Sequence, residues 1–194
     1  GKRIIPVVVD HGLQKNSAQI SELVCSRLMK MGFTEVFSSK AHVELNDGLE
    51  ASARRARYKV FEQAIETFSA QFFLLGHNKN DQAESVLLGL ARGSGTRSLS
   101  GMALQNGIYV RPFLDLSREV IESACKEVNL EIWSDPHNEN LEFKRVLIRR
   151  ESLPKLESDL GPGVIDSLAR SARIMREDAD ALDQWAENVI NEIG

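Results

Sequence analysis

Cysteine, proline and long apolar runs are all scarce in this sequence of 194 residues. Its two cysteines, Cys25 and Cys125, form neither a C-x-x-C motif nor a zinc-binding spacing, so we interpret both as small buried hydrophobic side chains. No stretch approaches the roughly 20 apolar residues of a membrane-spanning helix, and the start does not resemble a signal peptide. These absences argue against a disulfide-stabilised or membrane-bound domain. We expect a cytoplasmic protein with no membrane partner.

Positive charge is not in excess, because 24 basic residues face 28 acidic ones and the net charge is −4. The chain is therefore not a polycation that coats nucleic acid indiscriminately. Its basic residues are unevenly placed, however. One run combines Lys144, Arg145, Arg149 and Arg150 without an acid, and a second places Arg170, Arg173 and Arg176 at three-residue intervals. Such runs are usually solvated helix faces, but two in one third of the chain favour a local RNA- or phosphate-binding surface.

Apolar runs and amphipathic stretches alternate along the chain. The pattern predicts strands at 4–9, 35–38, 72–75 and 108–110, and helices at 17–31, 49–68, 81–91 and 117–128. Strands that alternate with helices predict an α/β fold with a three-layer open parallel sheet. Turn-rich sequence follows, then helices near 142–153 and at 164–193. We therefore predict a nucleotide-binding α/β domain over residues 1–133 and a helical extension over 134–194.

The segment 76–85 follows a predicted strand and opens a helix. In an open parallel sheet, ligands bind at the carboxyl ends of the strands. Asp81 and Glu84 are three residues apart and share one face of the first helical turn. Unpaired carboxylates at this place suit an ammonium group, a metal ion or a proton to be removed. The structural alternative is that Asn80 or Asp81 caps the helix and Glu84 completes a capping-box-like arrangement.

Three further clusters are candidates for nucleotide or phosphate contacts. Asp10 and His11 follow the first predicted strand, where they border a nucleotide pocket or merely end the strand. Arg54 and Arg57 share a helix face and could both reach one phosphate, although a solvated face is the simpler interpretation. The glycines in 92–97 let backbone N–H groups approach an anion, or simply stop the preceding helix.

Taken in order, these motifs resemble the N-terminal domain of the tRNA(Ile)-lysidine synthetases, a family of N-type ATP-pyrophosphatases. The matching motifs are V-D-H-G-L at 9–13, E-x-x-A-R-x-x-R-Y at 50–58, H-x-x-(D/N)-D-x-x-E-(S/T) at 77–85, R-G-(S/T)-G at 92–95, G-(M/L) at 101–102, R-P at 111–112, D-x-x-N at 135–138 and R-x-x-I-R at 145–149. The resemblance runs from about residue 7 to residue 176. It implies a Rossmann-like fold of the adenine nucleotide alpha hydrolase type.

The resemblance also implies a ligase for tRNA modification. Members of the family use ATP to adenylate the wobble cytidine of tRNA(Ile) with the anticodon CAU and release pyrophosphate. Free L-lysine then displaces AMP, which leaves lysidine. The implied partners are therefore this tRNA, L-lysine and ATP with Mg²⁺ as its counter-ion, and a homodimer is a further expectation.

Roles for individual residues come with the resemblance. The implied catalytic residues are Arg54, His77, Asp81 and Glu84, of which the acids bind the lysine ammonium groups or deprotonate the attacking amine. The implied nucleotide contacts are Asp10, His11, Arg57, Arg92, Gly93, Ser94 and Gly95. The implied tRNA-phosphate contacts are Lys144, Arg145, Arg149, Arg150 and Arg173. No protein metal ligand is implied.

One element of the family is missing. No S-G-G-x-D-S loop, which grips pyrophosphate through backbone amides and a helix N-terminus, occurs in these residues. We expect a fragment of a longer enzyme that does not use ATP efficiently by itself. The alternatives are a degenerate RNA-binding member, another ATP-pyrophosphatase such as a tRNA thiolase, against which the two isolated cysteines argue, and a divalent metal site of His77, Asp81 and Glu84.

Overall fold

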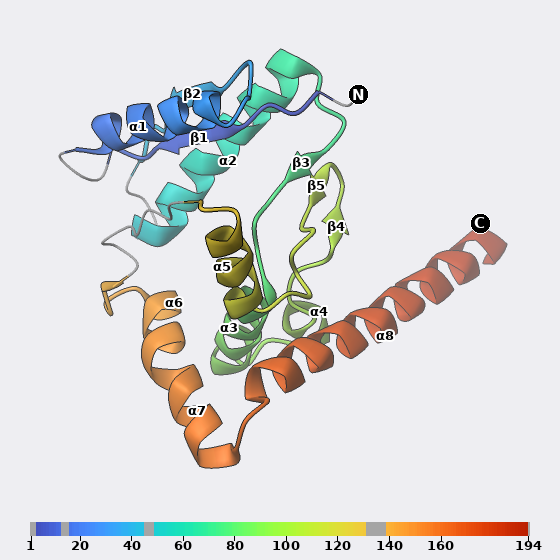
Figure 1. Cartoon of the computed structure of the whole chain (residues 1–194). Coiled ribbons are helices and arrows are strands. Elements are labelled where there is room, and N and C mark those ends of the chain that lie inside the picture. The colour runs from blue at the N-terminus through green and yellow to red at the C-terminus, as the bar shows by residue number, and fades with distance from the viewer. Residues whose placement is uncertain (1–2, 13–15, 45–48, 131–138, 194) are drawn as a thin grey trace. The chain divides into compact units, whose positions relative to one another are not determined.

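A computed structural model describes residues 3–12, 16–44, 49–130 and 139–193 of the chain (Figure 1). Strands and helices are combined as the α/β prediction requires. The chain divides into two compact units, Gly1–Phe73 and Leu74–Gly194. This division falls inside the predicted α/β domain. The predicted boundary between residues 133 and 134 lies outside the described residues, so it stays a prediction.

The first unit contains a parallel βαβ arrangement. Strand β1 (Val7–Asp10) pairs in parallel with β2 (Phe37–Lys40), and the register runs from Val7 opposite Phe37 to Asp10 opposite Lys40. Helix α1 (Ser17–Lys30) joins the two strands, and α2 (Leu49–Phe68) follows them. The first strand begins later than predicted because Pro6 has no N–H to donate. The Pro6 carbonyl still accepts a hydrogen bond from the Phe37 N–H at 2.9 Å.

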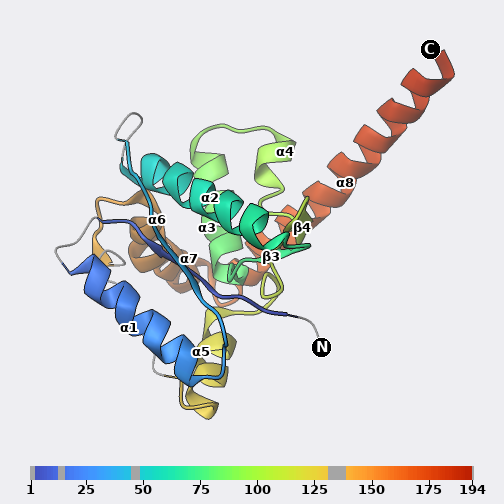
Figure 2. The same ribbon diagram turned by 90° about the horizontal axis from the view of Figure 1, so that it is seen from above.

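The core of the first unit lies between the strands and α2. Ala41, Ala56 and Val60 are buried, and Val7 and Val9 pack against them. Side chains alternate along a strand, so Asp10 faces away from this core. Helices α1 and α2 both contact β1 (Figure 2). The carboxyl end of β1 therefore presents a polar side chain outside the apolar core.

The second unit has a small sheet in the order β3-β5-β4. Its strands are β3 (Phe73–Leu74), which starts at the last residue of the first unit, β4 (Gln105–Asn106) and β5 (Tyr109–Val110). Strands β4 and β5 are antiparallel, which differs from the uniformly parallel sheet that the alternation predicts. The Gly107-Ile108 turn between them explains the difference. Gly107 has a φ of +57°, and such a residue favours a tight hairpin.

Helices make up most of the second unit. They are α3 (Lys79–Ala91), α4 (Thr96–Leu99), α5 (Arg118–Glu127), α6 (Lys144–Leu147), the π-helical segment η2 (Ile148–Ser152), α7 (Leu153–Leu160) and α8 (Val164–Ile193). The predicted limits of α8 are confirmed, as is Ser117 as the N-cap of α5, where its side chain accepts from the Val120 N–H. Helices α6, η2 and α7 follow one another without a break, further than the predicted 142–153. No helix among the described residues has the length and apolarity to cross a membrane.

Helix α8 is held against α3 and α4 (Figure 1). Its small residues Ala172 and Ala179 are buried in this contact. Polar contacts reinforce it, since Arg176 donates to the carbonyl oxygens of Ser100 at 3.0 Å and Gly101 at 2.6 Å. Other ion pairs join Lys79 to Asp166, and Arg97 to Asp180 and Asp183. The beginning and middle of α8 are therefore part of the second unit's structure.

The loop after α4 is fixed by one glutamine. The Gln82 side chain accepts from the Met102 N–H at 2.7 Å and donates to the Met102 carbonyl at 3.0 Å. Gly101 has a φ of +59°, and a Cβ atom there would lie 2.6 Å from Gln82 Oε1. We expect Gly101→Ala to lower the free energy of unfolding by about 2–3 kcal/mol, because Gln82 can move only by breaking both hydrogen bonds.

Urea unfolding would measure this loss, and Gly107→Ala is the matched control. Gly107 has nearly the same φ, +57°, but nothing lies within 4 Å of its Cβ position. The control should therefore show only the backbone strain, about 1 kcal/mol. Equal losses in the two variants would contradict a steric role for Gln82.

Candidate functional site

Helix α3 begins with a capping box. Asn78 Oδ1 accepts from the Asp81 N–H at 3.1 Å, and Asp81 Oδ2 accepts from the Asn78 N–H at 2.9 Å. The N-cap is thus Asn78, and the prediction of Asn80 or Asp81 is wrong. Asn78 has the extended backbone of an N-cap, and Asp81 stands at the third helical position, where its carboxylate reaches back. Asn80 instead accepts from the Arg118 N–H at 3.0 Å, which joins α3 to the start of α5.

Glu84 is not part of the capping box. Its side chain is fully buried, with 0% exposed, and it accepts two hydrogen bonds from Arg149. Arg149 Nε lies 2.6 Å from Glu84 Oε1, and Arg149 Nη2 lies 3.1 Å from Glu84 Oε2. Arg145 Nη1 lies 3.6 Å from the same Oε2. The contact between Arg149 and Glu84 is therefore bidentate, which is the strong form of the carboxylate–guanidinium pair.

Asp81 also has guanidinium partners. Its Oδ1 lies 3.4 Å from Arg149 Nη2 and 3.9 Å from Arg118 Nη2. The sequence-based expectation that the acids are unpaired is therefore wrong. A fully buried carboxylate needs a counter-charge, and residues distant in the sequence provide it. We call Asp81, Glu84, Arg118, Arg145 and Arg149 the carboxylate–guanidinium cluster.

The cluster keeps Arg149 charged. Burial alone would lower the pKa of Arg149, but the hydrogen bonds and charge of Glu84, and the charge of Asp81, outweigh it and raise this pKa above its usual value. Ser85 supports the arrangement, because its hydroxyl donates to the Asp81 carbonyl at 2.8 Å and accepts from Arg145 Nη2 at 3.2 Å. Three guanidiniums thus face two carboxylates.

The arginines reach α3 because of where the α6–η2 stretch is anchored. Val146 of α6 and Leu153, the first residue of α7 directly after η2, are buried. Arg145 and Arg149 are four residues apart and hence on one helical face, which these anchors turn toward α3. The helical spacing of the two arginines was readable in the sequence. Their partners were not, nor was Arg118, because no local pattern links residues so far apart.

Other predicted site residues of the second unit lie outside the cluster. Half-buried His77 directly precedes the N-cap of α3. The predicted loop of Arg92, Gly93, Ser94 and Gly95 follows the other end of α3. It lies about 16 Å along the helix axis from Asp81, at 1.5 Å per residue. Its implied contact with the nucleotide stays a prediction.

The predicted RNA-binding residues fall into two groups. Arg145 and Arg149 point into the cluster. Lys144, Arg150 and Arg173 are exposed. Among the residues that the structure describes, Arg150 pairs with exposed Glu139 at 3.1 Å, and Arg173 with exposed Glu177 at 4.0 Å. Surface pairs of this kind are weak and leave the cations available to phosphate.

In the first unit, predicted nucleotide residues come together at the end of β1. Arg57 Nε donates to His11 Nε2 at 3.2 Å, so this histidine nitrogen acts as an acceptor. The nearly buried Asp10 accepts from the Gly12 N–H at 2.8 Å through Oδ1. The pKa of Arg57 is lowered, first by burial and then by the charge of Arg54, while Tyr58 acts in the opposite direction.

Arg54, whose charge acts on Arg57, makes its direct contacts with Tyr58. Its guanidinium lies over the Tyr58 ring, 4.8 Å from the centroid, and donates to the Tyr58 hydroxyl at 3.1 Å. The cation–π contact holds the side chain along α2. The Glu50–Arg54 pair that helical spacing suggests involves a side chain outside the described residues.

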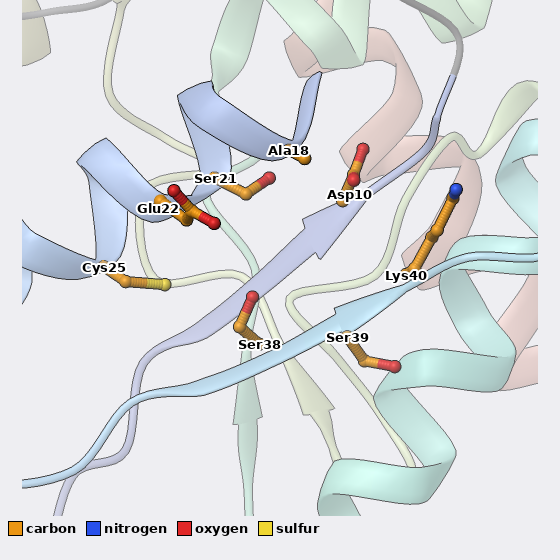
Figure 3. A pocket seen from close by; sticks show the side chains of 8 residues that line it. All are labelled: Asp10, Ala18, Ser21, Glu22, Cys25, Ser38, Ser39 and Lys40. Carbon is orange, nitrogen blue, oxygen red and sulfur yellow. The ribbon is translucent and has the colours of Figure 1, made fainter. Parts of the chain in front are cut away.

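A cavity of about 400 Å³ lies between α1 and the ends of β1 and β2. Figure 3 shows Ser21, Glu22 and Cys25 of α1 on one side and Asp10, Ser38 and Lys40 of the strands on the other. Small-molecule sites usually have volumes of roughly 300–1,000 Å³. The surface of the cavity is mostly apolar, but acids, hydroxyl groups and the ammonium group of Lys40 lie among the lining residues. The strand ends nearby are where a nucleotide is expected.

No protein metal centre is visible in the described part of the chain. Within it, no three His, Cys, Asp or Glu side chains gather in a way that could hold an ion. The two acids of the proposed His77–Asp81–Glu84 metal site are bound to arginines instead. The predicted D-x-x-N loop at 135–138 lies outside the described residues.

Comparison with known proteins identifies the family. Residues 2–156 match the model of the PP-loop domain, a family of ATP-binding domains, and the chain belongs to this family. A solved structure, the U34-tRNA thiolase NcsA from Methanococcus maripaludis with its 4Fe-4S cluster, has a similar fold. Its TM-score is 0.69 at 15% identity, with 89% of this chain and 62% of that chain covered.

Two curated proteins are more similar to this chain in sequence than NcsA is. A tRNA(Ile)-lysidine synthase of Thermobifida fusca is 46% identical over 194 residues, which is 100% of this chain and 60% of the relative. A tRNA(Ile)-lysidine synthase of Streptomyces coelicolor is 48% identical over 189 residues, which is 96% of this chain and 54% of the relative. The chain therefore spans a little over half the length of these curated relatives.

Proposed function

We propose that this chain supplies the PP-loop part of a tRNA(Ile)-lysidine synthase. The observation that carries the proposal is the 46% identity to such an enzyme along the whole chain. In the proposed reaction, the wobble cytidine oxygen attacks the α-phosphorus of ATP, and pyrophosphate leaves. An amino group of lysine then attacks C2 of the adenylated base, loses a proton and expels AMP.

The first unit is the proposed place of the nucleotide. Asp10 and His11 stand at the end of β1, the usual ligand side of such a strand. Arg57, beside His11, would steady negative charge on the phosphates or the adenylated base. Mg²⁺ would neutralise the pyrophosphate during its departure. Because the described residues form no acidic metal cluster, the polyphosphate itself is the proposed holder of this ion.

The second unit is the proposed place of lysine. Asp81 keeps 15% of its side chain exposed and can reach an incoming amine, whereas Glu84 is fully buried. We therefore assign Asp81 as the general base or ammonium ligand that meets the amine. Glu84 orients Arg149 and adds negative charge behind Asp81. The exposed cations Lys144, Arg150 and Arg173 are proposed contacts of tRNA phosphates.

The test is lysine-dependent AMP release from ATP, with the protein expressed from its complete reading frame. We expect release with a tRNA(Ile) transcript that has the anticodon CAU, and lysidine in the recovered RNA. The matched control is the same transcript with uridine at the wobble position. Uridine has a carbonyl at C4 in place of the amino group that, in cytidine, donates electron density to the C2 oxygen attacking ATP. No AMP release with the cytidine transcript, or equal release without lysine, would rule out this function.

A thiolase-type reaction is the second candidate because of the fold shared with NcsA. Iron–sulfur clusters are held by several cysteine thiolates. The 194 residues contain only Cys25 and Cys125, which lie in different units and are both free. The lysidine synthase proposal is therefore favoured.

A further inference from the structure

Arg149 is a candidate for two incompatible tasks. As part of the basic run it is proposed to bind tRNA, yet its guanidinium lies in hydrogen-bond contact with both acids proposed to receive lysine. A guanidinium and an ammonium group offer the same chemistry to a carboxylate, namely positive charge and N–H donors. Arg149 therefore fills the place that the lysine ammonium would need.

The charge balance of the carboxylate–guanidinium cluster also opposes lysine binding. Three guanidiniums and two carboxylates leave a surplus of one positive charge, which repels an ammonium group. Arg145 and Arg149 belong to one helical stretch, whereas Arg118 starts α5. If both arginines of the stretch leave, the surplus becomes one negative charge. The cluster would then attract the amine that it now excludes.

The two arginines are placed to respond to a polyanion. Arg145 keeps 35% and Arg149 24% of the side chain exposed, so neither is sealed in. Lys144 and Arg150, their direct neighbours in the sequence, are exposed and extend the positive surface outward. Arg149 also lies in the π-helical segment η2, and such segments often occur at functional sites.

We propose that Arg149, assisted by Arg145, blocks the lysine site until phosphates of the bound tRNA draw these side chains away. This inference rests on the proposed function and adds an order of binding to it. Lysine binds productively only after tRNA, because the same guanidiniums serve first as counter-ions of Asp81 and Glu84 and then of the RNA backbone. Lysine is thereby kept from the acids when no tRNA is present to accept it.

The decisive measurement is calorimetric lysine binding to the intact protein, without ATP, in the presence and absence of tRNA(Ile). For the unchanged protein we expect tRNA to tighten lysine binding by about tenfold or more, within the usual range of coupling between sites. Arg149→Gln should bind lysine without tRNA nearly as tightly as the unchanged protein does with tRNA. Its dissociation constant for tRNA should rise by a few-fold, since one phosphate contact is lost.

Two further variants keep the test decisive if Arg149→Gln does not fold. Arg149→Lys retains the charge but loses the forked contact with Glu84, so its tRNA-free lysine binding should be intermediate. Arg145→Gln removes the weaker guanidinium partner of Glu84. It should also tighten tRNA-free lysine binding, but by less than Arg149→Gln does. Lys155→Gln is the charge-matched control, because in the described part of the chain Lys155 pairs with exposed Asp159 on α7. This variant should bind lysine as the unchanged protein does.

The outcomes separate the two proposals. Equal lysine affinity with and without tRNA in the unchanged protein would overturn the blocking role of Arg149. The blocking role would also be overturned if Arg149→Gln and Arg149→Lys both fold and, without tRNA, bind lysine as weakly as the unchanged protein does. Either result could accompany normal lysine-dependent AMP release, in which case the lysidine synthase function would stand. Loss of that release in the unchanged protein would instead contradict the function itself.

Discussion

Glu84→Ala should lower the free energy of unfolding by about 2–3 kcal/mol. Breaking a buried ion pair usually costs about 3–5 kcal/mol, because the remaining charge is left without its partner. The cost is smaller here because Arg149 keeps contact with Asp81 at 3.4 Å and with water through its 24% exposed side chain. Chemical unfolding, followed by circular dichroism, would measure the loss.

A double-mutant cycle with Arg149→Ala separates the ion pair from the cavity that truncation leaves. If the pair carries the effect, the double variant should be more stable than the sum of the two single losses predicts, by about 1–3 kcal/mol. Strict additivity would mean that Glu84 stabilises the unit by packing alone. Glu84 is buried together with Gln82, Ala83 and Val86 of α3, so some packing cost is expected in either case.

Asp81→Asn should reduce lysidine formation by roughly 10²–10⁴-fold, the usual contribution of a general acid or base. Asparagine has nearly the same shape and can still accept from the Asn78 N–H, so the capping box survives. The loss of charge removes the proton acceptor for the lysine amine. Single-turnover formation of lysidine, with adenylated tRNA measured in parallel, would locate the defect in the second step.

The matched control is Asn78→Ala. It breaks the same capping box from the other side but keeps the carboxylate of Asp81, and should cost about 1 kcal/mol of stability. Much of the lysidine formation should remain. If Asn78→Ala impairs the reaction as strongly as Asp81→Asn, then Asp81 acts through the helix start and not on the amine.

Local sequence patterns predicted the helices well. The limits of α2 and α8 agree with the periodicity of 49–68 and 164–193, because each helix has a regular apolar face. The antiparallel β4–β5 pair was missed, since strands of two residues give no measurable alternation. The π-helical segment was also missed, because its residues have the composition of an ordinary helix.

The candidate site was predictable only residue by residue. The resemblance selected Asp81, Glu84, Arg145 and Arg149, all of which meet in one cluster. It did not show that the acids are neutralised by the arginines, because charge pairing across more than 60 positions depends on how α6 and η2 pack on α3. The N-cap was misplaced for a simpler reason. Asn78, Asn80 and Asp81 all have side chains typical of an N-cap, and the sequence alone does not choose among them.

The capping box has a consequence for the reacting atom itself. One oxygen of Asp81 accepts a hydrogen bond from the backbone N–H of Asn78, which restrains rotation of the carboxylate, and it is Oδ1 that faces the guanidiniums. Any base at this place is pre-organised before its substrate arrives, and the helix start sets its direction. Small shifts in how α3 begins would then re-aim that oxygen, so residues that never meet the substrate could tune the speed of the chemical step.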